Sequence, residues 1–449
     1  MSDLPLSAVI LAGGRGARMR SRTPKVLHEI CGRSMIDWVI GACREVGIES
    51  DRLFVVHQPG EPGVVEHLAG KARLVAQPEP LGTGHALAQV PAEWLGQGDV
   101  LVLNGDGPLL RAETIRHFLA AHRAASLPAS LASVEDASRN DGRVLRNAEG
   151  GLAAIIEYRD LTEQSRSVNE INVGLYCFAA RQLSAALAQL RPDNQAGELY
   201  LVDVFQHLSG TQVVKLPDAE ETIGINDRVQ LARAETAMRR RLLESLMLEG
   251  VTVRDPASTY VAAGVSIGQD TVLEPYTMVT GSTRIGRECR IGPFAQINDC
   301  QISDGIRIDS SWLSGATLGS GSDCGPFSKL RAGTELKESV HVGSFAELVR
   351  SEIGSRSAVP HVSYLGDATV GEGVNIGAGS ITANYDGRQK KATVIEDDCF
   401  IGVDTMLVAP RRLGRGARTG AGAVVTKDVP AGVTVVGVPA RAIPDKERA

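Results

Sequence analysis

The chain has 449 residues, of which 43% are hydrophobic, so it is long enough for two or three domains with buried cores, and wholesale disorder is excluded. The formal net charge is −6, which provides no overall positive field for nucleic acid or an anionic membrane surface. Aromatic residues make up only 4%, too few for base-stacking platforms, whereas the 49 glycines exceed the roughly 7% that is average. The glycine excess requires a structural explanation.

The cysteine pattern and the N-terminal segment bear on location. No C-x-x-C pair occurs among the seven scattered cysteines, which indicates a reducing compartment and packing roles: Cys31, Cys43, Cys177, Cys289, Cys300, Cys324 and Cys399. The opening MSDLPLSAVILAGG lacks the basic and apolar regions of a signal peptide, and no later run approaches the ~18 apolar residues of a membrane span. A soluble, cytoplasmic protein without nucleic-acid or membrane partners is expected.

The first half of the chain alternates short apolar runs with segments of helical periodicity. The runs predict strands at Ser7–Leu11, Leu53–Val56 and Val100–Leu103. Apolar residues spaced by three and four predict amphipathic helices over Met35–Gly47 and Ala112–Ala125. Residues 1–227 are therefore expected to form an α/β domain with a parallel, Rossmann-like sheet.

Residues 228–250 contain no proline and are rich in Ala, Leu, Arg, Glu and Met, with Gly250 as a natural stop. This composition predicts a helical arm between two domains.

From residue 251 to 449 an aliphatic-glycine pair recurs, mostly at multiples of six residues. The aliphatic members of these pairs are Ile267, Ile285, Ile291, Leu318, Val342, Ile353, Val370, Ile376, Ile401 and Leu413. Such hexapeptide repeats wind a left-handed parallel β-helix with the aliphatic residue inside and a small residue at the corner. The interruption at 378–394 (AGSITANYDGRQKKATV) is expected to leave the helix as a loop, where function tends to lie.

A glycine-rich segment, LAGGRGARMRSRTPK (Leu11–Lys25), follows the first predicted strand directly. Its glycines allow backbone N–H groups to face an anion, and Arg15, Arg18 and Lys25 supply positive charge for a triphosphate. The segment is neither a Walker A motif nor a G-x-G-x-x-G fingerprint. Asp106, after the predicted strand at 100–103, has the hard carboxylate that Mg²⁺ prefers.

Together with QPEPLGTGHAL (Gln77–Leu87), LNGDGPLL (Leu103–Leu110) and EINVGLY (Glu170–Tyr176), this segment resembles the sugar-1-phosphate nucleotidyltransferases. The hexapeptide repeats that follow are similar to those of the bifunctional members, which join an N-acetylglucosamine-1-phosphate uridyltransferase to a glucosamine-1-phosphate acetyltransferase. The resemblance covers essentially the whole chain. It implies UTP and acetyl-CoA as co-substrates, Mg²⁺ as cofactor and a homotrimer, which the flat faces of a β-helical prism also favour.

In the N-terminal domain the resemblance implies a nucleotide site formed by Leu11, Ala12, Gly13, Gly14, Arg18, Lys25, Gln77, Gly82 and Thr83. It implies amino-sugar contacts from Gly142, Glu157 and Asn172, and metal ligation by Asp106 and Asn226. Three positions depart from the family pattern: Gly13, Asn104 and Gly107 stand where alanine, tyrosine and an aliphatic residue are usual.

In the C-terminal domain the resemblance implies that His361 is the general base that accepts the amine proton during acetyl transfer. It implies sugar-phosphate contacts from Arg331, Tyr364 and Asn375, and acetyl-CoA contacts from Ala378, Asn384, Tyr385 and Ala421, with Lys390 near the CoA phosphates. Val349 and Val403 replace a phosphate-binding lysine and a serine of the family pattern.

These two valines leave an alternative open, in which the chain is a monofunctional uridyltransferase and the β-helix is an oligomerisation scaffold. A third hypothesis is a sugar-nucleotide-binding regulator without turnover, which the intact Asp106, Lys25 and Asn226 disfavour.

Overall fold

The computed structural model describes residues 5–14, 16–96 and 98–443. The chain divides into two compact units, residues 1–238 and 239–449. The division falls inside α8 (Arg228–Leu248), so the helix predicted for this region is present and ends two residues before Gly250. Among the described helices, none has the length and apolarity needed to cross a bilayer.

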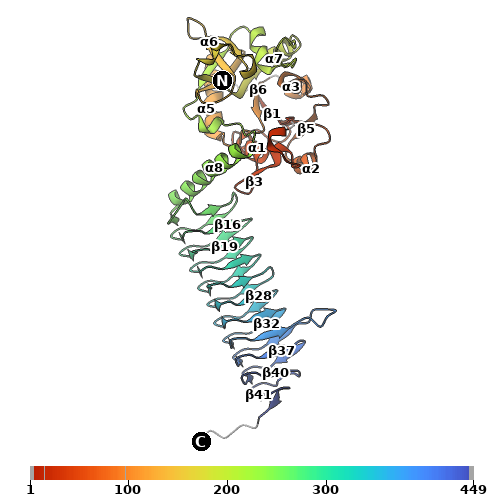
Figure 1. Cartoon of the computed structure of the whole chain (residues 1–449), viewed down its shortest axis with the longest axis vertical. Coiled ribbons are helices and arrows are strands. Elements are labelled where there is room, and N and C mark those ends of the chain that lie inside the picture. The colour runs from red at the N-terminus through yellow and green to blue at the C-terminus, as the bar shows by residue number, and fades with distance from the viewer. Residues whose placement is uncertain (1–4, 15, 97, 444–449) are drawn as a thin grey trace. The chain divides into compact units, whose positions relative to one another are not determined.

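The described part of the first unit is built on a mixed nine-stranded sheet with the central order β11-β7-β10-β6-β1-β4-β5 (Figure 1). Four neighbouring strands run parallel, as predicted: β5 (Arg73–Ala76), β4 (Leu53–His57), β1 (Leu6–Leu11) and β6 (Asp99–Asn104). The other strands are β7 (Ala129–Glu135), β8 (Arg143–Arg146), β9 (Leu152–Ile156), β10 (Glu170–Ala179) and β11 (Gln212–Lys215), with a separate hairpin of β2 (Glu29–Ile30) and β3 (Arg33–Ser34).

Strand β10 departs from the predicted parallel sheet, because it runs antiparallel to both β6 and β7. Parallel neighbours are usually joined through a crossover helix, whereas the chain between β7 and β10 forms the antiparallel β8–β9 hairpin. Between β9 and β10 the chain forms only η3 (Tyr158–Asp160) and the short α6 (Glu163–Arg166). The sheet is therefore mixed on the β10 side.

Helices cover both faces of the sheet and bury two separate apolar clusters. On one face lie α1 (Met35–Glu45), α2 (Val64–Leu68) and α5 (Ala112–Ala125), whose Ile36, Leu68 and Phe118 are fully buried. The opposite face is covered by α3 (Thr83–Ala88), α4 (Ala92–Leu95), α7 (Ala180–Leu187) and η4 (Leu201–His207). Shorter 3₁₀ segments are η1 (Ala17–Met19), η2 (Lys25–Leu27) and η5 (Glu220–Thr222). The unit is a three-layer α/β structure.

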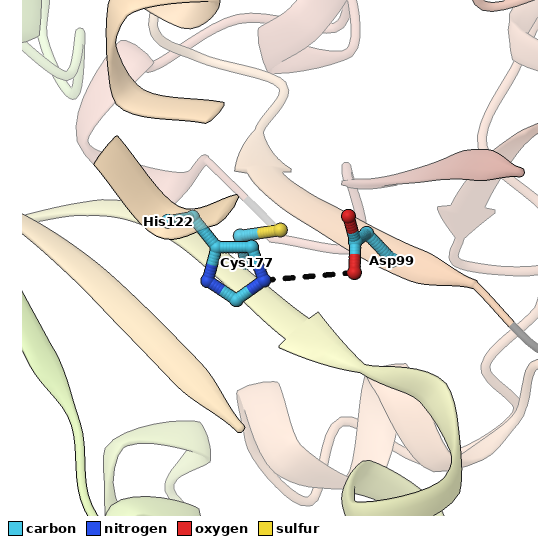
Figure 2. Close-up of side chains that lie close together, drawn as sticks. All are labelled: Asp99, His122 and Cys177. Atoms are coloured by element: carbon cyan, nitrogen blue, oxygen red, sulfur yellow. Dashed lines mark ion pairs between the residues drawn. The ribbon is translucent and has the colours of Figure 1, made fainter. Parts of the chain in front are cut away.

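A buried polar cluster ties α5 to the amino-terminal end of β6 (Figure 2). Nε2 of His122 lies 3.6 Å from Oδ1 of Asp99, and its Nδ1 lies 2.8 Å from Oγ of Ser130. Burial raises the pKa of the adjacent Cys177 thiol well above its usual value, so the thiol is neutral. Open α/β sheets bind ligands at the carboxyl ends of their strands, so we assign this cluster a structural role. All seven cysteines are buried, which agrees with the predicted packing roles.

The described part of the second unit is a left-handed parallel β-helix with three faces. Face 1 contains β12 (Thr252–Val253), β15 (Val272–Leu273), β18 (Arg290–Ile291), β21 (Arg307–Ile308), β24 (Asp323–Cys324), β27 (His341–Ser344), β30 (Ala358–His361), β33 (Asn375–Ile376), β36 (Phe400–Ile401), β39 (Arg418–Thr419), β41 (Thr434–Val436) and β42 (Arg441–Ala442). Face 2 contains β13 (Tyr260–Val261), β16 (Met278–Thr280), β19 (Gln296–Asn298), β22 (Trp312–Ser314), β25 (Lys329–Leu330), β28 (Glu347–Val349), β31 (Tyr364–Gly366), β34 (Ile381–Ala383), β37 (Met406–Val408) and β40 (Val424–Val425). Face 3 contains β14 (Ser266–Ile267), β17 (Arg284–Ile285), β20 (Gln301–Ile302), β23 (Thr317–Leu318), β26 (Glu335–Leu336), β29 (Glu352–Ile353), β32 (Ala368–Val370), β35 (Thr393–Ile395) and β38 (Arg411–Leu413).

The repeat explains both the core and the glycines of this unit. The aliphatic residues of the repeated pairs, such as Ile267 and Ile285, point inward and form one continuous buried cluster. A Cβ added to Gly268 would lie 2.6 Å from the backbone of Gly286 in the next coil, so a side chain at this corner has no room. The close stacking of coils therefore requires glycine.

The loop predicted at 378–394 is shorter than expected. Ile381 begins a strand, β34, that pairs with β31 and β37, so this part of the segment stays in the β-helix. The residues between β34 and β35, 384–392, leave the coil as a projecting loop (Figure 1). Thr382 is buried at the inward position that an aliphatic residue occupies in other coils. The strand was not predicted because this position lacks the aliphatic-glycine pair that identified the repeat.

Candidate functional site

Residues that follow β1, β5 and β6 line a cavity of about 530 Å³ at the carboxyl ends of these strands. It contains twelve of the predicted residues: Leu11, Ala12, Gly13, Gly14, Arg18, Lys25, Gln77, Gly82, Thr83, Asp106, Glu157 and Asn226. Val26, Pro80, Ala86, Asn104 and Glu198 also line it and were not predicted as site residues. Arg15 lies outside the described residues.

A second cavity of about 260 Å³ adjoins the first, and the two share Leu11, Thr83, Asn104, Asp106, Glu157 and Asn226. The second cavity adds the two remaining predicted residues of this unit, Gly142 and Asn172. The structure thus brings together residues from positions 11 to 226 in one pair of connected hollows. Their sizes suit a nucleotide in the first and a sugar in the second.

The ammonium group of Lys25 lies between the two predicted metal ligands. Lys25 Nζ forms an ion pair with Oδ2 of Asp106 and donates a 2.8 Å hydrogen bond to Oδ1 of Asn226. Lys25 begins η2, directly after Pro24, whose fixed φ helps to direct the chain into this turn. Two oxygen ligands from residues 120 positions apart therefore converge on one positive charge.

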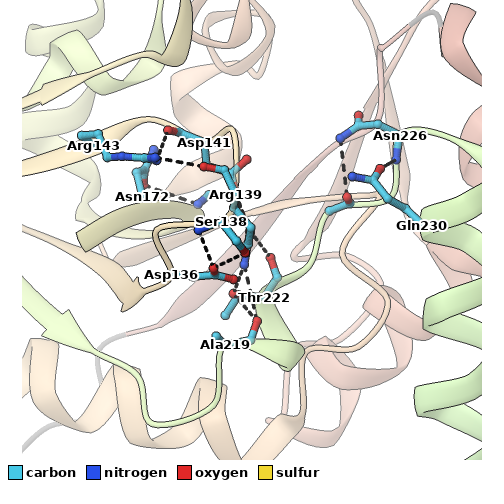
Figure 3. Close-up of polar contacts among 12 residues, drawn as sticks. Asp136, Ser138, Arg139, Asp141, Arg143, Asn172, Ala219, Thr222, Asn226 and Gln230 are labelled. Carbon is cyan, nitrogen blue, oxygen red and sulfur yellow. Dashed lines mark hydrogen bonds and ion pairs between the residues drawn. The ribbon is translucent and has the colours of Figure 1, made fainter. Parts of the chain in front are cut away.

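Hydrogen bonds hold both predicted oxygen ligands in place. The N–H of Ile225 donates to the carbonyl oxygen of Asp106 at 2.9 Å, so the segment before α8 lies against the end of β6. The N–H of Asn226 donates to Oε1 of Gln230, one turn into α8, at 2.7 Å (Figure 3). The start of α8 thereby orients Asn226.

One wall of the first cavity is formed by Gln77 against the glycine-rich turn. Gln77 is buried, and its Nε2 donates to the carbonyl oxygen of Gly82 at 3.1 Å. A Cβ on Gly13 would lie 2.8 Å from Oε1 of Gln77, so the glycine at this position, where the family usually has alanine, allows the closer approach. Thr83 Oγ1 accepts a hydrogen bond from the N–H of Leu201, which fixes the opposite wall.

Glu157 and Asn172 lie at the second cavity and have different surroundings. Asn172 donates its backbone N–H to the carbonyl oxygen of Gly142 at 2.8 Å and its Nδ2 to the hydroxyl of Tyr176 at 2.7 Å. Burial raises the pKa of the Glu157 carboxyl to about 7, and the carboxylate of Asp141 acts in the same direction. Glu157 therefore titrates near neutral pH.

The sequence reasoning missed Arg139, Asn140 and Asp141, which line the second cavity beside Gly142. Arg139 makes ion-pair and hydrogen-bond contacts to Asp141 and Thr222 (Figure 3). Nothing in the sequence places these residues together, since Thr222 is more than 80 positions away. Their closeness to the predicted Gly142 was the one available signal.

In the second unit, His361 ends β30 and is exposed at the corner between face 1 and face 2. Its carbonyl oxygen accepts a 2.7 Å hydrogen bond from Oγ of the buried Ser363, which fixes the backbone below the imidazole. Tyr364 begins the next strand, β31, and Asn375 begins β33, one coil further on face 1. The coil places His361, Tyr364 and Asn375 on neighbouring strands.

The arginines near the predicted sugar-phosphate contacts already form ion pairs with carboxylates. Arg331 NH1 lies 3.1 Å from Oε1 of Glu347. Val349, at the position of the family's lysine, is 3% exposed. The neighbouring Arg350 contacts both carboxylate oxygens of Asp367, at 2.6 and 2.9 Å, and so does not supply a free cation in place of the lysine.

The predicted acetyl-CoA residues lie around the projecting loop and the next corners. Asn384 is buried and donates to Asp367, whereas Tyr385 is exposed and bridges to Lys390 across the base of the loop. Ala378 follows β33, and Ala421 follows β39 on the same face. Val403 is 48% exposed at the corner after β36.

Comparisons with known proteins match both units. The family model of the MobA-like NTP transferase domain matches residues 8–208, that of the bacterial transferase hexapeptide matches 264–299, and that of the hexapeptide repeat of succinyl-transferase matches 392–427. Three curated relatives share the name "Bifunctional protein GlmU". The relative from Syntrophomonas wolfei is 45% identical to this chain, over 95% of this chain and 96% of the relative. The relative from Geobacillus sp. is 43% identical, over 94% of this chain and 93% of the relative. The relative from Rubrobacter xylanophilus is 46% identical, over 99% of this chain and 95% of the relative. The chain belongs to the GlmU family of bifunctional enzymes, which combine a nucleotidyltransferase with a hexapeptide-repeat acyltransferase.

Proposed function

We propose that this chain makes UDP-N-acetylglucosamine in two steps. The β-helix transfers the acetyl group of acetyl-CoA to glucosamine-1-phosphate, and the α/β unit then transfers the uridylyl group of UTP to the product and releases pyrophosphate. The observation that carries the second step is the meeting of Lys25, Asp106 and Asn226 at the wall shared by the two cavities. An attacking sugar phosphate and the α-phosphorus of UTP would meet at this wall.

The oxygen donors there fit Mg²⁺. Carboxylate and amide oxygens are hard ligands that Mg²⁺ accepts, and both already face one cationic group, the ammonium of Lys25. Asp106 and Asn226 would hold the ion, which would supply positive charge to the phosphates when bound. Phosphoryl and nucleotidyl transfer depend mainly on positioning and charge neutralisation, so a site of this kind is sufficient for the chemistry.

The protein's own groups then have separate tasks. The backbone N–H groups of the Leu11–Gly14 turn and the charge of Arg18 bind the triphosphate. Gln77 presents hydrogen-bonding groups to the base, and its contact with Gly82 fixes its orientation. Glu157 in its ionised form accepts hydrogen bonds from sugar hydroxyls, and Asn172 contacts the acetamide group. Lys25 stabilises the negative charge that moves to the leaving pyrophosphate.

In the β-helix, His361 acts as general base. Its imidazole accepts a proton from the sugar amine as the nitrogen attacks the thioester carbonyl carbon, and CoA leaves as the thiol after protonation. Arg331 binds the sugar phosphate, and Tyr364 and Asn375 contact the sugar. The exposed Tyr385–Lys390 loop, with Ala378, Asn384 and Ala421, binds acetyl-CoA.

One assay tests both steps. Purified protein receives glucosamine-1-phosphate, acetyl-CoA, UTP and Mg²⁺, and free CoA and pyrophosphate are measured separately. Release of both supports the proposal. Pyrophosphate release only from ready-made N-acetylglucosamine-1-phosphate would refute the acetyltransferase step, and its absence with that substrate would refute the uridyltransferase step.

An exposed apolar ladder supports the homotrimer. Bulky side chains project from corners between face 1 and face 2, at residues with positive φ: Tyr276, Phe294, Phe327, Phe345 and Val362. Ser310 occupies the corner between Phe294 and Phe327 and interrupts the row. The rings of Tyr276 and Phe294 stack at 4.9 Å, and those of Phe327 and Phe345 at 5.3 Å. Exposed apolar side chains gathered in this way mark an interface. Because Val362 follows His361 directly, a second copy on this ladder would also cover the acetyltransferase site.

Light scattering tests this assembly. The wild-type chain should have three times the mass of one chain, and Phe345→Asp should lower the mass because a carboxylate would be buried in the interface. A monomeric wild type would refute the trimer. The seven buried cysteines, scattered without a C-x-x-C pair, support a reducing, cytoplasmic location for the assembly.

A further inference from the structure

The loop between β7 and β8, residues 136–142, is held in one conformation by its own side chains. Oδ1 of Asp136 accepts hydrogen bonds from the N–H and Oγ of Ser138. The buried Arg143 donates to the carbonyl oxygens of Asp141 and Arg139, at 2.7 and 3.0 Å. The loop, whose contacts at Asp136, Ser138 and Arg143 are drawn in Figure 3, is therefore an ordered element. It positions Gly142 at the second cavity.

The guanidinium group of Arg139 connects this loop to a distant segment. Nε and NH2 contact Oδ2 of Asp141, at 2.7 and 2.6 Å. NH1 donates to Oγ1 of Thr222 at 2.8 Å, and NH2 donates to the carbonyl oxygen of the same residue at 2.9 Å. NH1 also reaches the carbonyl oxygen of Ala219 at 3.4 Å. Only arginine has a planar fork of donors that can serve both partners at once.

The segment that Arg139 contacts leads directly to the predicted metal site. Thr222 precedes Gly224, which lies against the carboxylate of Asp106, and Asn226 follows two residues later. From the other side, Glu221 is buried and accepts hydrogen bonds from Thr114 Oγ1 and from the N–H of Arg111 at the start of α5. Residues 219–226 are thus fixed by α5 and by Arg139.

The positive charge of Arg139 also changes the electrostatic field in the second cavity. Asp141, Glu157 and Asp106 all line the second cavity, and a sugar phosphate that enters it is anionic. The ion pair with Arg139 offsets the charge of Asp141, which otherwise would repel the phosphate. Loss of Arg139 would therefore both release the loop and add negative field to the sugar subsite.

We propose that Arg139 is a positioning residue of the uridyltransferase, which ties the sugar-binding loop at Gly142 to the metal-binding segment at Asn226. This inference rests on the proposed function of the α/β unit. The link joins the sugar and metal subsites, and the contacts of Arg139 with described residues do not reach the glycine-rich turn. Its loss should therefore affect the sugar phosphate and Mg²⁺ and leave UTP unaffected.

Steady-state pyrophosphate release tests the proposal, with N-acetylglucosamine-1-phosphate, Mg²⁺ and UTP varied in turn. Arg139→Gln should raise KM for the sugar phosphate about tenfold and raise the half-saturating Mg²⁺ concentration severalfold, with kcat and KM for UTP within about twofold of the wild type. Arg139→Lys keeps the positive charge without the planar fork of donors, so its KM for the sugar phosphate should lie between those of the wild type and Arg139→Gln. Thr222→Val, which leaves all charges unchanged, should shift the same two constants by less.

The matched control is Arg146→Gln. Arg146 ends β8, the strand that follows the loop, and makes a bidentate pair with Glu170 of β10. These contacts do not reach residues 219–226, so the loss of Arg146 should leave all four constants unchanged. Wild-type kinetics in Arg139→Gln, an equal rise in KM for UTP, or a fall in kcat alone would overturn the proposal. If Arg139→Gln does not fold, Arg139→Lys and Thr222→Val decide. A wild type without pyrophosphate release would refute the proposed function instead.

Discussion

The pH dependence of sugar binding provides a test of Glu157. Burial and the neighbouring carboxylates raise its pKa from 4.5 to about 7. With that pKa, the ionised fraction rises from about one-eleventh at pH 6 to about ten-elevenths at pH 8. If only the carboxylate accepts hydrogen bonds from sugar hydroxyls, KM for N-acetylglucosamine-1-phosphate should fall about tenfold over this range, while KM for UTP should not follow the same profile.

The assay is initial-rate pyrophosphate release at saturating UTP and Mg²⁺ from pH 6 to 8. Glu157→Gln is the control, because it keeps the shape of the side chain without its titration and reports the contribution of the substrate's own phosphate. The variant should have a higher KM at pH 8 than the wild type and lack the tenfold change. Identical pH profiles of KM in the two proteins would refute the assigned role.

The same carboxyl affects stability with a defined sign. Its pKa is higher in the folded chain than the 4.5 of an unperturbed glutamate, so between pH 4.5 and 7 the folded state binds more protons than the unfolded state. The free energy of unfolding should therefore fall as pH rises through this window, by about 3 kcal/mol in total for a shift of this size. Urea unfolding at pH 5 and pH 8 should show this loss in the wild type and not in Glu157→Gln.

Three further predictions concern single residues. Asp106→Ala should abolish Mg²⁺-dependent pyrophosphate release and leave CoA release from the other unit unchanged, and retained pyrophosphate release would place the metal elsewhere. His361→Ala should lower CoA release at least a hundredfold, in the range of general base catalysis, with uridyl transfer from N-acetylglucosamine-1-phosphate as the internal control. Val349→Lys should lower KM for glucosamine-1-phosphate about tenfold or more, because an added charged hydrogen bond contributes about 1.5–3 kcal/mol. The existing cations, Arg331 and Arg350, are both paired with carboxylates. An unchanged KM would show that the phosphate does not approach this position.

Periodicity predicted the elements well where one face of the element is buried by a regular pattern. The strand at Leu53–Val56 and the helix at Ala112–Ala125 were found with bounds that differ from the observed ones by at most one residue. The β-helix followed from the aliphatic-glycine repeat, because each coil repeats the same inward position and the same crowded corner. The strand that lies wholly within the predicted loop, β34, buries Thr382 in place of an aliphatic residue.

The sequence by itself determined the two architectures and, through the family resemblance, fourteen of the residues that line the two cavities of the first unit. What it did not contain is which distant groups become partners. The link from Arg139 to Thr222 and the pairing of Arg350 with Asp367 depend on the packing of separate segments. Local patterns decide whether a segment is a strand or a helix, since that choice depends on neighbours in sequence. Charge pairing and pKa values depend on neighbours in space, so only the tertiary structure decided them.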